Sequence, residues 1–325
     1  MQLSLRQESW PISGSFAIAR GRKTEADVVV VEVRDGAFTG RGECVPYAHY
    51  SESVDGVTSL LDGMSGHVTN GLGRARLQEL LEAGAARNAL DSALWDLEAK
   101  RSGKRVWELA GLQPPKPVTT AFTLSLEDPD VMRNAARTHA HVPLLKIKLG
   151  GADDLDRVAA VREAAPKARL IVDANEGWTP QSYSELMPEL ARLGVTMVEQ
   201  PLPAEADEAL AELPRPIPVC ADESCHDRSS LAAIDGRYDM INIKLDKTGG
   251  LTEALQLRDQ ARKAGLGIMV GCMISTSLAM APAVVLAQNV AVVDLDGPLL
   301  LARDREDGLH FEGSSIYPPT AALWG

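Results

Sequence analysis

The sequence predicts an α/β fold, a (β/α)7β TIM-type barrel that follows a smaller α+β unit. Two observations favour this fold. In the second part of the chain, short apolar runs that close on a polar residue recur at steps of 25, 25, 26, 23, 22, 27 and 23 residues, with helical patterns between them. The first part has strand patterns followed by helical ones, which is typical of an α+β unit. The 325 residues suffice for one large and one smaller domain, at roughly 100 to 200 residues per domain.

The amino-terminal unit, residues 1–115, begins as an antiparallel sheet. Residues 28–33 are mostly β-branched, Asp35-Gly36 marks a tight turn, and residues 38–43 return along the first strand. Apolar residues at helical spacing then predict a helix over residues 86–109. A proline cluster interrupts any periodic element and predicts a domain boundary: Pro114, Pro115 and Pro117.

Residues 116–300 are predicted to form the barrel. Its eight strand ends are Thr123, Lys148, Asp173, Glu199, Asp222, Lys244, Gly271 and Asp294. Eight strands at so steady a period imply a closed parallel barrel. An open doubly wound sheet is the alternative, but no Gly-rich dinucleotide or phosphate loop follows its first strand. After Asp296 no long amphipathic helix follows, and residues 307–311 look like a hairpin strand, so residues 301–325 are predicted to return to the first domain.

Composition and charge exclude several classes of protein. A net charge of -12 disfavours nucleic acid and anionic membranes as partners, because both require a basic face. Residues 264–293 lack charge, and a membrane helix needs only about 20 apolar residues. Polar residues and a proline divide this stretch into strand, helix and strand, which predicts a buried segment: Ser275, Thr276, Ser277, Pro282, Gln288 and Asn289.

The four cysteines show no disulfide framework, which favours a reducing compartment. Cys220, Cys225 and His226 lie close in sequence, but a zinc site would need a further pair of ligands, so buried small hydrophobes are the favoured interpretation. The amino terminus has no apolar segment of the kind that export requires. We therefore expect a cytoplasmic protein.

Polar residues gather at the predicted strand ends, where barrels of this kind build their active sites. Asp173, Glu199 and Asp222 stand on consecutive strands and form an all-oxygen set that suits Mg²⁺. Each acid alone could equally cap the helix that follows it. Three in a row, each behind an apolar strand, favour the metal site.

Two lysines flank these acids in the strand order. Lys148 lies one strand before them and Lys244 one strand after them, which predicts a base on either side of the metal. Lys146, on the same face of its strand as Lys148, could lower the pKa of that neighbour by its charge. The alternative is a surface pair on an edge strand, which the preceding leucines disfavour. Lys247 and Asp246 are interpreted as solvated groups or as groups behind the metal ligands.

The motifs KIK, DAN, EQPL, ADES and NIKLDKTGGL, with AARNALDSALWDLEAKRSG upstream, resemble those of the enolase superfamily over almost the whole chain. Within it the chain is most similar to dipeptide epimerases of the L-Ala-D/L-Glu type. The resemblance implies an amino-terminal capping domain and one Mg²⁺ per subunit. It also assigns roles to the site residues: metal ligands Asp173, Glu199 and Asp222, acid/base lysines Lys148 and Lys244, and substrate-binding residues Thr123, Lys146, Asp294 and Asp296.

The implied reaction is epimerisation of the carboxyl-terminal residue of a dipeptide, L-Ala-L-Glu to L-Ala-D-Glu, through a metal-stabilised enediolate, as in murein peptide recycling. Asp294 and Asp296 would bind the ammonium group of the dipeptide. The alternatives are a lyase or cycloisomerase of the muconate or o-succinylbenzoate type, and a metal-binding barrel without catalysis. Barrels of this kind often form homo-oligomers.

Two capping loops, residues 15–23 and 46–53, are expected to close over the barrel mouth and exclude water. Arg20, Arg22 and Lys23 could hold the side-chain carboxylate of a glutamate residue. A solvated cationic loop is the alternative interpretation for each of them.

Overall fold

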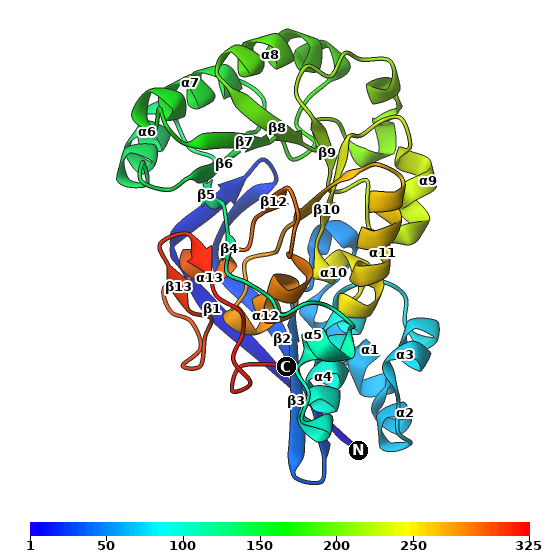
Figure 1. Cartoon of the computed structure of the whole chain (residues 1–325). Helices are drawn as coiled ribbons and strands as arrows, with labels where there is room; N and C mark the ends of the chain where they lie inside the picture. The colour runs from blue at the N-terminus through cyan, green and yellow to red at the C-terminus, as the bar shows by residue number, and fades with distance from the viewer.

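The computed structural model describes residues 1–325. The chain begins with an antiparallel sheet in the order β1-β2-β3, made of β1 (Gln2–Ile18), β2 (Gly21–Asp35) and β3 (Phe38–Cys44). The pairing of β1 with β2 shifts register between Pro11 and Phe16, and the hairpin continues beyond this irregularity. In Figure 1 the blue hairpin tip reaches up to the barrel strands. The first capping loop is thus the tip of a long hairpin.

Five helices follow this sheet: α1 (Val54–Gly63), α2 (Ser65–Thr69), α3 (Arg74–Leu80), α4 (Ala85–Ser102) and α5 (Val106–Leu109). Helices α1, α2 and α4 pack on the sheet, and α3 and α5 pack against α4. Helix α4 packs directly on β3 because that strand carries glycines where they meet. A Cβ at Gly42 would lie 2.1 Å from the carbonyl oxygen of Ala89. The helix predicted over residues 86–109 is in fact two helices, because Gly103 adopts a left-handed conformation (φ 69°) that ends α4.

Eight parallel strands follow in sequence order around the barrel. They are β5 (Phe122–Leu124), β6 (Leu144–Lys148), β7 (Arg169–Asp173), β8 (Val195–Glu199), β9 (Val219–Ala221), β10 (Met240–Ile243), β11 (Gly267–Val270) and β12 (Val292–Val293). A backbone hydrogen bond of 2.8 Å from Ala121 N to Val293 O joins the first strand to the last. This closure confirms the barrel and excludes the open sheet.

The predicted strand ends match the observed ones to within a residue. Lys148, Asp173 and Glu199 end their strands, and Thr123 lies at the centre of β5. The other four predicted ends each follow their strand by one residue: Asp222, Lys244, Gly271 and Asp294.

Helices follow the barrel strands: α6 (Pro129–Thr138), α7 (Asp154–Ala164), α8 (Pro180–Arg192), α9 (Leu231–Ile234), α10 (Leu245–Thr248), α11 (Leu251–Lys263), α12 (Ser277–Leu286) and α13 (Gly297–Leu300). Between β8 and β9 the chain forms only short 3-10 turns, η2 (Ala204–Ala206) and η3 (Glu208–Ala211). The uncharged stretch, residues 264–293, is β11, the buried α12 and β12, as predicted. None of the helices is both long and apolar enough to cross a bilayer.

The barrel interior is filled below the site by one apolar cluster, with one residue from each of seven strands and Ala121, directly before β5: Ala121, Leu144, Ile171, Met197, Cys220, Met240, Met269 and Val292. All eight are buried. Such a cluster is the normal filling of a small barrel. It places a dry floor under the polar residues at the carboxyl ends of the strands.

The carboxyl-terminal segment contacts both parts of the molecule. It forms a hairpin of β13 (Phe311–Glu312) and β14 (Ser315–Ile316), and β14 pairs with β4 (Val118–Thr119) at the start of the barrel. The sequence had predicted that this hairpin strand returns to the amino-terminal domain. The return to the first domain is made by Leu301, which bridges to Ile12, and by Trp324, whose indole Nε1 donates to Ser92 O at 3.0 Å. Two-residue strands carry too little pattern to identify their partner.

Candidate active site

Three carboxylates meet at the carboxyl end of the barrel. Asp173 and Glu199 are paired neighbours on β7 and β8, and Asp222 follows β9. One oxygen of each lies within 4.8 Å of the others, and all three side chains are buried. The parallel register therefore places the three predicted metal ligands in one cluster.

The environment separates the pKa values of these acids. Burial raises the pKa of Glu199 to about 7, with repulsion from Asp173 adding to the effect. Burial would also raise the pKa of Asp173, but attraction to Lys148 and Lys146 outweighs it and lowers that pKa to about 2. Asp222 is likewise lowered well below its usual range, chiefly by Lys244, against the effect of burial.

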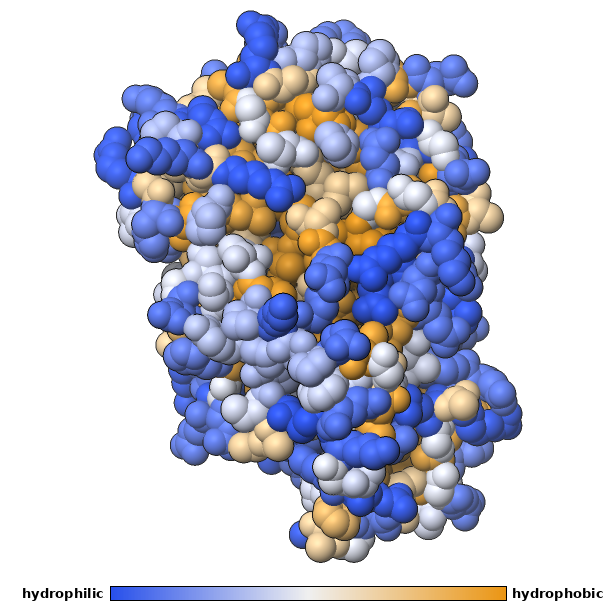
Figure 2. Space-filling view, viewed as in Figure 1, coloured by the Kyte–Doolittle hydropathy of each residue, from blue (hydrophilic) through white to orange (hydrophobic).

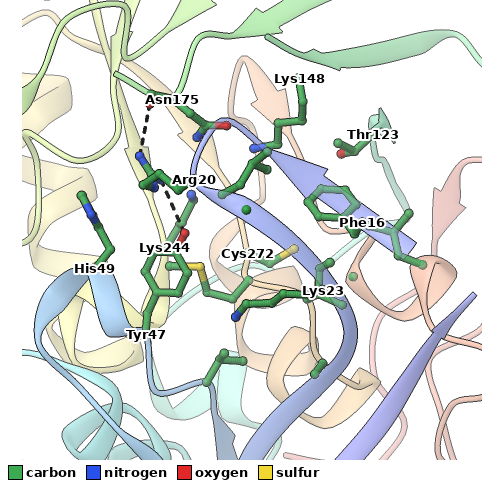
Figure 3. A pocket seen from close by; sticks show the side chains of 18 of the residues that line it. Phe16, Arg20, Lys23, Tyr47, His49, Thr123, Lys148, Asn175, Lys244 and Cys272 are labelled. Atoms are coloured by element: carbon green, nitrogen blue, oxygen red, sulfur yellow. Dashed lines mark hydrogen bonds between the residues drawn. The ribbon is translucent and has the colours of Figure 1, made fainter. Parts of the chain in front are cut away.

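The two predicted acid/base lysines approach the acids from different strands. Lys148 Nζ lies 2.5 Å from Asp173 Oδ2, and Lys244 Nζ lies 2.5 Å from Asp222 Oδ2. Both side chains are at least nine-tenths buried. Burial alone would lower the pKa of Lys244, but the attraction of Asp222 and Glu199 raises it well above its usual range. Figure 3 shows both lysines reaching into the same pocket.

Lys146 is buried among carboxylates. Its Nζ lies 2.7 Å from Asp294 Oδ2, 2.7 Å from Glu199 Oε2 and 3.3 Å from Asp173 Oδ2. These attractions outweigh the opposing effect of burial and raise the pKa of Lys146 well above its usual range. Lys146 therefore stays positive. It links the three candidate metal ligands to the pair of acids that follows the last strand, Asp294 and Asp296.

That acid pair closes the ring of polar groups. Asp296 accepts a hydrogen bond of 2.6 Å from the backbone N of Thr123, and the Thr123 hydroxyl lies 3.4 Å from Asp294 Oδ1. Burial, with repulsion from Asp294, raises the pKa of Asp296 to about 7. Asp294 is paired with Lys146, whereas Asp296 has no cation within 4 Å.

Two groups that the sequence left open have defined places. Lys247 is fully buried, and its Nζ lies 2.6 Å from Asp222 Oδ1 and 3.0 Å from Asn242 O, so the solvated interpretation was wrong. Asp246 accepts hydrogen bonds from Val45 N at 3.1 Å and Asn88 Nδ2 at 2.8 Å, and it thereby ties the barrel to the amino-terminal domain. Both contacts join segments far apart in sequence, which a local pattern cannot reveal.

A cavity of about 510 Å³ lies above the acids, between the barrel mouth and the amino-terminal domain. Residues of the hairpin tip and of the segment around η1 (Ala48–Tyr50) form its outer wall, which includes Phe16, Lys23 and Tyr47 (Figure 3). Outside the cavity, the face of the molecule seen in Figure 2 is mostly hydrophilic, with hydrophobic residues gathered about half-way up. The amino-terminal domain thus supplies the outer wall of the cavity.

The cations of the hairpin tip differ in their partners. Arg20 donates to Glu223 at 2.6 Å and Glu176 at 3.0 Å, both on barrel loops. Arg22 contacts Glu127 at 2.7 Å and is about half exposed. Lys23 lines the cavity, 5.4 Å from the Tyr47 ring centre, with no carboxylate within 4 Å.

The sequence reasoning missed a group of buried polar residues behind the acids. Asn242 donates to Glu199 Oε1 at 2.7 Å, and the Gln200 side chain accepts from the backbone N of Asp222 at 2.8 Å. The available signal was a polar residue within the apolar strand β10, for Asn242, and a polar residue directly after β8, for Gln200. Their partners were not visible from sequence.

The donor set fits a hard divalent cation. The three acids offer only oxygens, and Glu199 Oε2 is buried without a hydrogen-bond donor, since Lys146 lies 2.7 Å from it but is not oriented for a hydrogen bond. Carboxylate oxygens at this spacing are the ligands that Mg²⁺ prefers.

The structure is a closed barrel with three acids on consecutive strand ends. Lysines flank the acids, and an α+β domain covers them. This arrangement defines the class of barrel enzymes whose active site lies under an amino-terminal cap. Two family models match the chain. The mandelate racemase / muconate lactonizing enzyme N-terminal domain matches residues 1–111, and the enolase C-terminal domain-like family matches residues 130–322. The chain therefore belongs to the mandelate racemase / muconate lactonizing enzyme family of the enolase superfamily, and the superfamily is the one that the motifs predicted.

Comparison with curated relatives and solved structures shows which members of the family the chain resembles. The chain is 48% identical to the L-Ala-D/L-Glu epimerase of Escherichia coli K12, over 96% of this chain and 98% of that protein. It is 44% identical to an N-acetyl-D-glutamate racemase from a Pseudoalteromonas species, over 92% and 95% of the two chains.

Among solved structures, one is an enolase family member from Agrobacterium tumefaciens with homology to dipeptide epimerases, bound to sodium and L-Ala-L-Glu. It matches with a TM-score of 0.98 and 54% identity over 99% of both chains. A dipeptide epimerase from Enterococcus faecalis, bound to Mg and L-Leu-L-Tyr, matches with a TM-score of 0.92 and 29% identity over 99% and 98%.

Proposed function

We propose that this protein is an isomerase, a Mg²⁺-dependent dipeptide epimerase that inverts the α-carbon of the carboxyl-terminal residue, with L-Ala-L-Glu to L-Ala-D-Glu as its principal reaction. The observation that carries the proposal is the pair of buried lysines, Lys148 and Lys244, on either side of the three carboxylates and under one cavity. The similarity of the chain to an L-Ala-D/L-Glu epimerase and to a dipeptide epimerase bound to Mg and a dipeptide supports it.

Asp173, Glu199 and Asp222 would hold the metal ion. Bound there, Mg²⁺ supplies positive charge against the negative charge that builds up on the substrate carboxylate as the α-proton leaves. With their charge offset in this way, Asp173 and Asp222 would attract Lys148 and Lys244 less strongly. Either lysine, released from that attraction in its buried site, would be suited to act as a base.

The proton transfer needs one lysine on each face of the α-carbon. Either Lys148 or Lys244, in its neutral form, removes the α-proton, and the other, in its ammonium form, delivers a proton to the opposite face. The roles exchange for the reverse reaction. The apolar cluster below and the amino-terminal domain above keep bulk water from protonating the intermediate.

Asp296 would bind the ammonium group of the dipeptide, with Asp294 held in place beside it by Lys146. Because Asp294 is already paired with a cation, the uncompensated charge belongs to Asp296. A buried carboxylate of this kind favours a substrate that carries an ammonium group at that point.

Lys23 would bind the side-chain carboxylate of the glutamate residue. Of the three hairpin cations considered from the sequence, Arg20 and Arg22 already have carboxylate partners, and Lys23 does not. Lys23 also lines the cavity. An acidic substrate side chain would give Lys23 the carboxylate partner that it lacks.

N-Acetylglutamate is a second candidate substrate, because one relative with 44% identity is an N-acetyl-D-glutamate racemase. It shares the α-carboxylate and acidic side chain of Ala-Glu but has no ammonium group. Asp296 would then face an uncharged acetyl group, which is why we favour the dipeptide.

The test is to incubate L-Ala-L-Glu with the protein and Mg²⁺ in heavy water, with N-acetyl-L-glutamate in parallel. We expect L-Ala-D-Glu to form, with deuterium at the glutamate α-carbon, and much slower exchange on N-acetylglutamate. Absence of both inversion and deuterium uptake on every dipeptide tried would refute the proposal. Faster exchange on N-acetylglutamate than on L-Ala-L-Glu would make N-acetylglutamate the principal substrate instead.

We also propose a cytoplasmic role in recycling cell-wall peptides, where Ala-Glu units arise. The four cysteines are all unpaired, as is usual in a reducing compartment. A homo-oligomer remains part of the proposal, and size-exclusion chromatography with light scattering tests it.

A further inference from the structure

Gln200 occupies an unusual position directly after Glu199, one of the three candidate metal ligands. Its side chain is fully buried, and its backbone has a φ of 34°, a left-handed conformation that residues other than glycine adopt rarely. A non-glycine residue held in this conformation must be fixed by its surroundings. The backbone and side-chain hydrogen bonds of Gln200 provide that restraint.

The backbone of Gln200 links the strand ends on both sides. Its N donates to Cys220 O at 2.9 Å, and its O accepts from the N of Glu176 at 2.9 Å. Cys220 lies two residues before Asp222, and Glu176 lies three residues after Asp173. One residue therefore joins the three chain segments that carry the three acids.

The side-chain amide of Gln200 holds the segment of the third acid. Its Oε1 accepts from the backbone N of Asp222 at 2.8 Å and from the N of Ser224 at 3.1 Å. Its Nε2 donates to Leu202 O at 2.9 Å. These contacts fix the orientation of the amide, because a flipped amide would set its NH2 group against two backbone donors.

A second set of hydrogen bonds locks the amide from behind. Nε2 also lies 2.8 Å from Ser224 Oγ and 2.9 Å from the hydroxyl of Tyr238. Both hydroxyl groups lie 2.6 Å from Oδ2 of the buried Asp207, so their protons point to that carboxylate and their lone pairs face Gln200. Arg237 compensates the charge of Asp207 at 2.6 Å.

We infer that Gln200 is a positioning residue for metal binding: it sets the spacing of Asp222 relative to Glu199 and Asp173. The inference rests on the proposed function, since it takes these three acids to be the ligands of Mg²⁺. Residues that orient metal ligands typically affect metal affinity by about 10- to 100-fold when replaced.

The test is calorimetric titration of Mg²⁺ into metal-free Gln200→Met, which keeps the length of the side chain and removes its hydrogen bonds. We expect Mg²⁺ binding to weaken by about 10- to 100-fold, with activity largely recovered at saturating Mg²⁺. Gln288→Met is the matched control, because Gln288 bonds Lys116 and Val284 far from the acids, and its Mg²⁺ affinity should match the parent protein. A folded Gln200→Met that binds Mg²⁺ as the parent does would overturn the inference.

Two further measurements cover the other outcomes. If Gln200→Met does not fold, Tyr238→Phe removes one partner of the amide and should weaken Mg²⁺ binding several-fold; unchanged affinity there would also overturn the inference. Amide hydrogen exchange of residues 219–226 in metal-free protein should be faster in Gln200→Met than in the control, and equal exchange would count against the inference. A parent protein that binds no Mg²⁺ would contradict the proposed function instead, and exchange would still test the positioning role.

Discussion

Replacing Asp296 by asparagine tests how the site recognises a dipeptide. Asp296 has no cation within 4 Å, whereas Asp294 is held by Lys146 at 2.7 Å, so the substrate ammonium group should depend mainly on Asp296. A charge-assisted hydrogen bond of this kind contributes about 1.5 to 3 kcal/mol. At about 1.4 kcal/mol per tenfold change, Asp296→Asn should raise KM for L-Ala-L-Glu by about 10- to 150-fold with a smaller change in kcat.

The pH dependence of the same variant gives an independent check. The pKa of Asp296 is raised to about 7, so below that pH the carboxyl is protonated and cannot pair with the ammonium group. Dipeptide binding by the parent protein should therefore strengthen as pH rises through about 7. Titration of the lysines affects both proteins, so the ratio of parent to variant kcat/KM between pH 5.5 and 8 isolates Asp296. A pH-independent ratio, or an unchanged KM in the variant, would refute this account of ammonium binding.

Three further predictions concern specificity and stability. Lys23→Glu should reduce kcat/KM for L-Ala-L-Glu by at least about tenfold and favour dipeptides with a basic or neutral second residue, measured on a small dipeptide panel; an unchanged preference would exclude Lys23 as the carboxylate site. Gly42→Ala should destabilise the amino-terminal domain by about 1 to 3 kcal/mol, because the new methyl group meets Ala89 O, and thermal unfolding should show the loss while Gly63→Ala, in open space, shows little. Burial raises the pKa of Asp246 to about 7, above its value in the unfolded chain. The contribution of Asp246 to stability is therefore complete below about pH 4 and is lost as pH rises to about 7, by up to about 4 kcal/mol. In urea unfolding, the free energy of unfolding of Asp246→Asn should fall less steeply with pH than that of the parent protein, and equal slopes would refute the assignment.

The barrel and its acids were predictable because both depend on local patterns. Each strand is a short apolar run, and parallel pairing brings all strand ends to one face. Once the strands were recognised, Asp173, Glu199 and Asp222 had to meet. The motifs then supported the family, which the comparisons confirm.

The remaining features depend on contacts between distant segments. Lys247 was expected to be solvated as one alternative, but its ammonium group is fully buried against Asp222. Arg20 was a candidate for the substrate carboxylate, yet it is paired with Glu223, 203 residues further along the chain. The Gln200 network joins four separate loops. No periodicity in the sequence specifies such pairs, because each partner alone looks like an ordinary polar residue.

The measurement that tests the central claim most directly is α-proton exchange by Lys148→Ala and Lys244→Ala, each with Mg²⁺ and each given L-Ala-L-Glu or L-Ala-D-Glu in heavy water. Loss of one positioned acid or base typically slows such a step by about 10²- to 10⁴-fold. We expect neither variant to invert the glutamate residue, and each to exchange the α-proton of only one diastereomer, a different one for each lysine. A variant that exchanges both diastereomers at the parent rate, or two variants that retain the same one, would contradict two bases on opposite faces.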